Sequence, residues 1–135
     1  MVKEELLINL TMLQQQAEQI EQQIYQADEQ IQEFIVLQEN LNNLKEKSQI
    51  LAPVGKGVFS KAELKEDKFF VNVGSGVIVK KTGEGAVEII QEQVNQLKKI
   101  RNELIEAMSQ INSELERIVD EARKEGDAGK IEKIK

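Results

Sequence analysis

The 135-residue sequence contains no cysteine and no histidine, which excludes thiol nucleophiles, disulfides, imidazole bases and the usual transition-metal ligands. Aromatic residues make up only 4% of the chain and charged residues 31%, a balance typical of long exposed helices rather than of a compact core. No apolar run approaches the roughly 20 residues of a membrane span, and the N-terminus lacks the pattern of a signal peptide. We therefore expect a cytoplasmic protein with no cofactor, no bound metal and no membrane contact.

Glycine and proline are also absent between residues 4 and 48, where apolar residues recur at alternating spacings of four and three. This heptad pattern predicts a long coiled-coil helix over 4–48. After Phe34 the apolar residues shift to Leu37, Leu41 and Leu44, which predicts a three-residue skip in the repeat. The predicted seam consists of Leu6, Leu10, Leu13, Ala17, Ile20, Ile24, Ala27, Ile31 and Phe34.

Residues 83–124 repeat the pattern and predict a second helix of matching length. Only Arg101 is not apolar, and a single polar seam residue typically fixes the register at a cost in stability. Its neighbour Ile100 is a candidate to share the position. The two helices are expected to pair antiparallel. The second seam consists of Val87, Ile90, Val94, Leu97, Arg101, Leu104, Met108, Ile111, Leu115, Ile118 and Ala122.

Between the helices, residues 49–82 contain the only proline and four short β-type runs, "SQILAPV", "VFSKAELK", "FFVNV" and "VIVKK". Glycine-rich turns join the first run to the second and the third to the fourth, which predicts two hairpins. The turn at Glu66 either connects the hairpins or pairs the second strand with the third. The predicted fold is α+β, in the order helix, four strands, helix. Residues 1–124 are expected to form one domain, followed by a flexible tail over 125–135.

The stretch "VNVGSGVIVKKTGEG" places two Gly-x-Gly elements between a strand and a helix, as nucleotide-binding loops do. A dinucleotide fingerprint needs a third glycine, but Val79 and Glu88 stand at the two positions concerned, and no Gly-Lys-Ser/Thr follows. The better interpretation is that Gly74-Ser75-Gly76 forms a hairpin turn and that Thr82 caps the second helix. Carboxylate pairs lie at polar helix positions without a sheltering pocket, so no catalytic site is predicted and the chain is not expected to be an enzyme.

Charge is distributed unevenly along the chain. Residues 1–50 have a net charge of −6, residues 51–82 of +3 and residues 83–124 of −3. Acidic helices on either side of a mildly basic centre argue against a nucleic-acid partner, which would require a basic surface.

Two surfaces remain as candidates for function. Four short strands leave open edges and exposed phenylalanines, so the strand block is expected to assemble with other subunits. The predicted interface comprises Val58, Phe59, Leu64, Phe69, Phe70, Val71, Val73, Val77 and Val79. The free end of the coiled coil carries more apolar residues than one seam requires, either as extra packing or as a surface that binds apolar segments. It comprises Leu6, Leu7, Leu10, Ile118, Val119 and Ala122, with Met12 nearby.

The Pro53-Val54-Gly55 turn, the "VFSKAELK" strand and "FFVNVGSGVIVKKT" followed by a heptad helix resemble the α class of archaeal prefoldin subunits. The resemblance covers nearly the whole chain, and two hairpins distinguish the α class from the β class, which has one. It implies a hexamer of two α and four β subunits with a double β-barrel platform. It also implies an ATP-independent chaperone that holds unfolded proteins at the coiled-coil tips and passes them to a group II chaperonin. The alternative is a structural homo-oligomer or filament built through the same platform.

Overall fold

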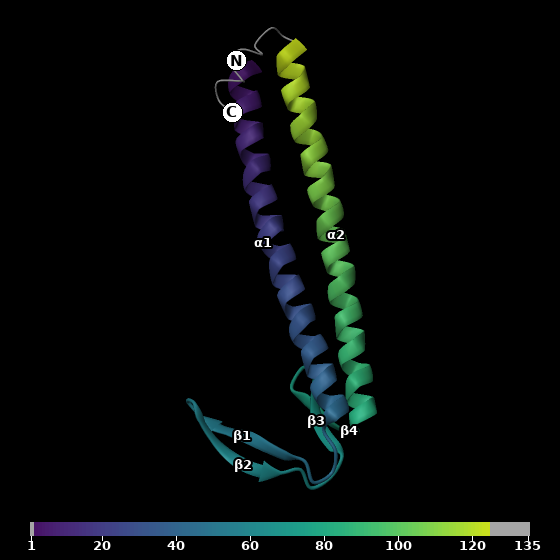
Figure 1. The fold of residues 1–135 in the computed structure, drawn as a ribbon. Coiled ribbons are helices and arrows are strands. Elements are labelled where there is room, and N and C mark those ends of the chain that lie inside the picture. Colours follow the sequence, from purple (N-terminus) through teal and green to yellow (C-terminus); the bar gives the residue numbers. More distant parts are fainter. Residues whose placement is uncertain (1, 125–135) are drawn as a thin grey trace. The chain divides into compact units, whose positions relative to one another are not determined.

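The computed structural model describes residues 2–124, and the predicted tail over 125–135 lies outside this range. In chain order, a long helix comes first, four strands follow, and a second long helix comes last, as predicted (Figure 1). The chain divides into two compact units, one formed by residues up to Glu29 together with those from Lys98 onward, the other by Gln30–Leu97. Within each unit a segment of the first helix runs antiparallel to a segment of the second.

Helix α1 spans Val2–Asn43, so the prediction that it continues to residue 48 is wrong. The chain turns after Leu44 because Ser48 provides hydrogen-bond partners that are not helical. The Ser48 hydroxyl accepts a hydrogen bond from Lys45 N at 2.9 Å, and the Ser48 carbonyl accepts one from Leu64 N at 2.9 Å. Lys47 has a positive φ of 69° and donates its N–H to Leu64 O at 2.8 Å. These bonds start the β ladder where helical bonds would otherwise continue.

The predicted three-residue skip in α1 is also wrong. Leu37 is 41% exposed, whereas Gln38 is half-buried and occupies the next seam position of the uninterrupted heptad. Gln38 tolerates this position because its Nε2 donates to Val87 O at 3.3 Å and to Gln91 Oε1 at 3.0 Å, both on the second helix. Hydrogen bonding to the neighbouring helix thus keeps the repeat in phase without an apolar side chain.

Helix α2 spans Gly83–Lys124, and each predicted seam position in it is buried or half-buried. Ile100 is 49% exposed, so the hypothesis that it shares the position of Arg101 is wrong. The predicted cap is confirmed: Thr82 Oγ1 accepts a hydrogen bond from Gly85 N at 3.1 Å.

The strands form two separate antiparallel hairpins, β1 (Gln49–Gly55) with β2 (Val58–Glu63), and β3 (Lys68–Gly74) with β4 (Val77–Thr82). The segment containing Glu66 therefore connects the hairpins rather than pairing β2 with β3. Each hairpin closes through two residues with positive φ, Lys56-Gly57 and Ser75-Gly76, as a type I′ turn requires. The interpretation of the glycine-rich stretch as a hairpin turn is confirmed.

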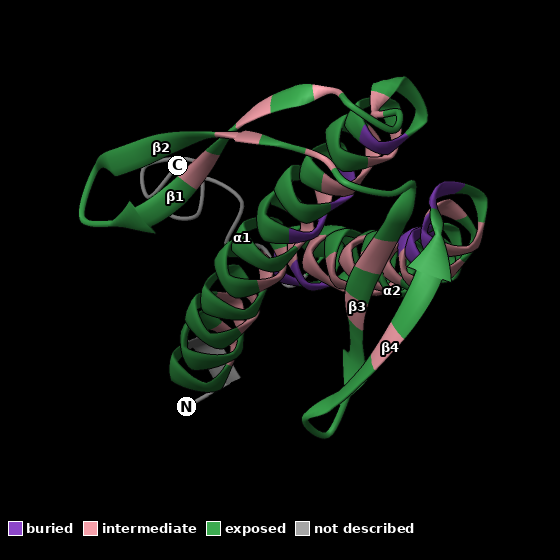
Figure 2. Cartoon of the chain, turned by 90° about the horizontal axis from the view of Figure 1, so that it is seen from below, coloured by how far each residue is buried: buried purple, intermediate pink, exposed green. Residues whose placement is uncertain are grey.

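The core of the unit Gln30–Leu97 lies between the helices next to β3. Phe69 and Val71 of β3 pack against this core, which covers the inward face of the β3–β4 hairpin. Most other hairpin residues are exposed (Figure 2). The buried members of the core are Ile31, Leu41, Ala86, Ile90 and Val94.

Candidate functional site

The first candidate site is a groove in the unit formed by residues up to Glu29 and from Lys98 onward. Near the start of α1 and the end of α2, the two helices leave an open groove of about 280 Å³, here called the end groove. Its apolar lining comes from Leu6, Met12, Leu13 and Ile118. Its polar lining comes from Asn9, Gln16, Glu114, Arg117 and Glu121.

The structure separates the predicted free-end residues into two groups. Ile118 and Ala122 are only 6% and 3% exposed, so they form the coiled-coil core. Leu6, Leu10 and Val119 are half-buried, and Leu7 is exposed.

Of the apolar side chains described at this end, Ile8 and Met12 are the most exposed, and Ile8 was not among the predicted residues. Both lie outside the seam in the heptad, and this departure from the pattern is the signal that would have identified Ile8. A ligand of the free end would therefore meet Leu7, Ile8 and Met12 before any seam residue.

The rim of the end groove carries a charged cluster on α2. Arg117 Nη1 donates to Glu121 Oε1 at 2.7 Å, and Arg117 Nε donates to Glu114 Oε2 at 3.2 Å. Arg117 Nη2 makes a further ion pair with Glu114 Oε1. The hydrogen bond from Arg117 lowers the pKa of Glu114 below its usual value, so this carboxylate stays charged under mildly acidic conditions.

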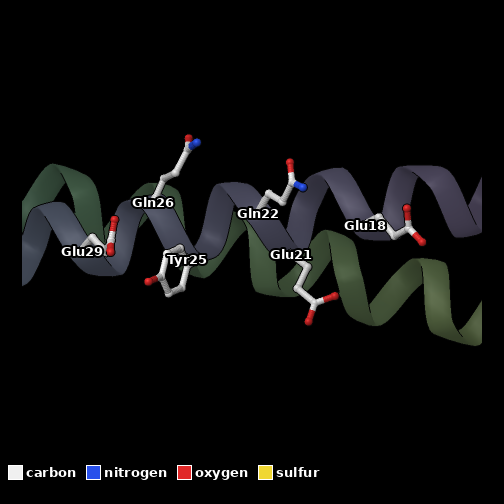
Figure 3. Close-up of a pocket in the computed structure, with 6 residues that line it drawn as sticks. All are labelled: Glu18, Glu21, Gln22, Tyr25, Gln26 and Glu29. Carbon is white, nitrogen blue, oxygen red and sulfur yellow. The ribbon is translucent and has the colours of Figure 1, made fainter.

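A second hollow, of about 570 Å³, lies along α1 and is lined by Glu18, Glu21, Gln22, Tyr25, Gln26 and Glu29 (Figure 3). All six side chains come from one helix, so no second element encloses a ligand there. Tyr25 is exposed, and a hydrogen bond with Glu29 raises its pKa. This hollow is the solvent face of α1. Within residues 2–124 no group of acidic side chains is arranged to hold a metal ion, and no helix is long and apolar enough to cross a membrane.

The second candidate site is the exposed apolar surface of the hairpins. Of the predicted interface residues, Val58, Phe59, Phe70, Val73 and Val77 are exposed. Leu64, Phe69, Val71 and Val79 are half-buried, and the chain's own core accounts for Phe69 and Val71. Three further hairpin residues that were not among the predicted interface residues are also exposed and apolar, namely Leu51, Val54 and Ile78.

The outward face of the β3–β4 hairpin is centred on Phe70, which is 74% exposed. Lys80, its cross-strand partner, holds its Nζ 5.8 Å from the centre of the ring and 2.7 Å from Glu66 Oε1. The hydrogen bond from Lys80 lowers the pKa of Glu66. Phe70 thus presents a large aromatic side chain to solvent, and aromatic residues are enriched at protein–protein interfaces.

Comparison with known proteins agrees with this architecture. The family model "Prefoldin subunit" matches residues 13–127. Prefoldin subunit alpha of Methanobrevibacter smithii is 36% identical over 111 residues, which cover 80% of this chain and 76% of the relative. Prefoldin subunit alpha of Thermofilum pendens is 31% identical over 121 residues, covering 86% of this chain and 91% of the relative.

A chain of filamentous PFD from Methanocaldococcus jannaschii, solved by cryo-electron microscopy, has a similar fold. Its TM-score is 0.52 at 20% identity, and the match covers 90% of this chain and 98% of the solved one. The family model spans most of the sequence, and the relatives match over most of their own length. The chain therefore belongs to the prefoldin subunit family, a family of chaperone subunits.

Proposed function

We propose that this chain is the α-type subunit of an ATP-independent holdase. It assembles through its hairpins with β-type subunits, two α with four β, and it holds unfolded proteins at the free end of its coiled coil for delivery to a group II chaperonin in the cytoplasm. Residues up to 124 work as a single domain in this proposal. The observation that carries it is that most of the exposed large apolar side chains lie on the hairpins and at the free end, while the seam is covered.

The exposed hairpin faces support assembly with partner strands. An isolated two-stranded hairpin is marginally stable in water, and its unpaired edges invite further strands. Burying one large apolar side chain contributes about 1.5–3 kcal/mol. The part of Phe59, Phe70 and the exposed valines that the chain leaves uncovered is therefore available for such contributions to a partner.

The free end supports the binding of unfolded clients. Met12 lines the end groove, which is open rather than enclosed, and Leu7 and Ile8 on the same helix expose further apolar surface. An open groove with a partly apolar lining binds a single segment weakly and without strict sequence demands. Several arms that hold one client raise the overall affinity through effective concentration. This mode of binding needs no nucleotide.

Client binding can be tested with three substitutions at exposed positions that should leave the fold intact, Leu7→Ser, Ile8→Ser and Met12→Ser. We expect this triple variant to assemble with a β-type partner but to protect a denatured client from aggregation less well, as measured by light scattering. The matched control replaces three exposed apolar residues elsewhere on the helices, Val36, Ile100 and Ile105, by serine. Equal protection by both variants at equal assembly would contradict client binding at the free end.

Assembly is tested separately with Phe59→Ser and Phe70→Ser. We expect both substitutions to lower the fraction of chain that enters a complex with the β-type partner, as measured by mass photometry. Unchanged assembly of the double variant would exclude these hairpin faces as the interface.

The alternative function is a structural homo-oligomer or filament. It is favoured by the likeness to a chain of filamentous PFD, and it would use the same exposed hairpin faces. Light scattering of the chain alone distinguishes the two functions. If the chain alone forms particles that keep growing, and this growth stops when the β-type subunit is added, the result favours the filament. A partner-dependent complex of fixed mass favours the holdase.

A further inference from the structure

We propose that the end groove selects apolar client segments flanked by lysine or arginine and disfavours those flanked by aspartate or glutamate. This inference rests on the proposed holding function and specifies the class of client that the same site prefers.

The first support is the hydrogen-bonding capacity of the rim. Arg117 is the only cation among the residues that line the groove, and it already donates to Glu114 and Glu121 through Nε, Nη1 and Nη2. A guanidinium has five N–H donors, whereas each carboxylate accepts at about four positions. The two carboxylates therefore retain more acceptor positions than Arg117 retains donors. A client lysine finds partners there more readily than a client carboxylate does.

The second support is the net charge around the groove. Two carboxylates and one guanidinium leave the rim with a net charge of −1. Within one heptad of Met12, residues 5–19 of α1 carry two acidic residues and no basic one. Within one heptad of Arg117, residues 110–124 of α2 carry four acidic and three basic residues, rim included, so the neighbouring charges do not reverse the sign of the rim. Because the Debye length is about 8–10 Å at physiological salt, the rim itself decides the sign.

The third support is the charge of the surrounding unit. Residues 4–29 of α1 carry six acidic residues and no basic one, and residues 98–124 of α2 carry six of each. A basic segment therefore approaches through an attractive field, which raises its association rate at low salt. Apolar contact still provides most of the binding, and the charge sets the preference among segments of similar hydrophobicity.

The test uses three peptides with one apolar centre, flanked by lysine, glutamine or glutamate and carrying a photo-crosslinker. Each is added to the complex of the full chain with its β-type partner, and the crosslink yield to this chain is measured by mass spectrometry. Relative to the neutral glutamine flank, attraction of lysine and repulsion of glutamate by the exposed rim each change affinity by at most about five-fold. We expect the order lysine, glutamine, glutamate, with a lysine-to-glutamate ratio of about five- to tenfold that shrinks as salt is added.

Rim variants provide the decisive comparison. Glu114→Gln with Glu121→Gln releases Arg117 and should reverse the order in favour of the glutamate-flanked peptide. Arg117→Gln should enhance the preference for lysine. The matched control, Glu103→Gln with Glu106→Gln, makes the same change of charge at exposed positions of α2 about 12 Å or more from the groove, and should leave the order unchanged.

The outcomes distinguish this inference from the proposed function. Equal crosslinking of all three peptides overturns the inference and leaves the holdase in place. A preference that the rim variants and the control variant change to the same extent also overturns it, because the charge of the whole unit would then act instead of the rim. Crosslinking of none of the peptides to this chain refutes client binding at the free end, and the inference with it.

Discussion

Replacing Arg101 by leucine should stabilise the coiled coil of residues 4–29 and 98–124, although the change removes an ion pair. Arg101 Nη1 lies 3.2 Å from Asp28 Oδ1, and the two side chains are 32% and 50% exposed. Its Nε is buried without a hydrogen-bond partner among the described residues. The Arg101 guanidinium is therefore desolvated at Nε without a hydrogen bond there, and it is paired with Asp28 only through Nη1.

The magnitude follows from three contributions. A partly exposed ion pair is worth about 0–1 kcal/mol, and this is lost. A buried donor without a partner costs about 1–3 kcal/mol, and this is recovered. A half-buried leucine at a seam position adds about 1 kcal/mol. Asp28 remains half-exposed and solvated, so no buried charge is left behind. The expected net gain in the free energy of unfolding is about 2 kcal/mol.

Urea denaturation of the full chain, followed by circular dichroism, measures this change. Lys99→Leu is the matched control, because Lys99 is exposed and outside the seam, and it should shift stability by less than about 0.5 kcal/mol. A loss of stability on Arg101→Leu would refute the reasoning and show that the ion pair outweighs the desolvation of Arg101. A gain combined with mixed helix registers, detected by disulfide trapping between introduced cysteines, would show that Arg101 fixes the register at a cost in stability.

Further predictions concern the core, a turn and one ion pair. Val94→Ala, at a site only 1% exposed, should lower the free energy of unfolding by about 2 kcal/mol in urea denaturation. Gly76→Val, at a φ of 74°, should cost about 1–2 kcal/mol and lower amide protection in the β3–β4 hairpin, as hydrogen exchange can measure. In an NMR titration, the pKa of Glu66 should lie below its usual value of 4.5 and rise in Lys80→Met. The small stabilisation from this pair is present above pH 4.5 and is lost as pH falls through the lowered pKa.

The heptad pattern predicted both helices and their seams because burial along a coiled coil depends on angular position alone. It failed where hydrogen bonds decide the outcome. Gln38 keeps its seam position because Val87 O and Gln91 accept its amide protons, a fact that no apolar count contains. The end of α1 was placed too late because residues 44–48 carry no glycine or proline, whereas Ser48 and Leu64 end the helix by pairing across the chain.

The sequence named two candidate surfaces, but it could not show which of their side chains are exposed. Because side chains alternate along a strand, the neighbours Phe69 and Phe70 must face opposite sides, but the sequence does not show which side packs on the helices. The structure places Phe69 against the core and leaves Phe70 exposed. At the free end, apolar character alone grouped buried Ile118 with exposed Leu7. Separating them requires the distance of each residue from the seam, which the sequence already contains once the heptad is assigned.

The two hairpins share one turn pattern but differ in the contacts that stabilise them. Pro53-Val54-Gly55-Lys56-Gly57-Val58 and Asn72-Val73-Gly74-Ser75-Gly76-Val77 follow the same pattern, and both hairpins shift register before a two-residue turn. The β3–β4 hairpin packs on the helical core through Phe69 and Val71, whereas the β1–β2 hairpin contributes no residue to that cluster. Because burial provides most of the stability of a strand pair, the β1–β2 hairpin depends more on contacts outside the chain. Partner binding should therefore slow amide exchange more in β1–β2 than in β3–β4.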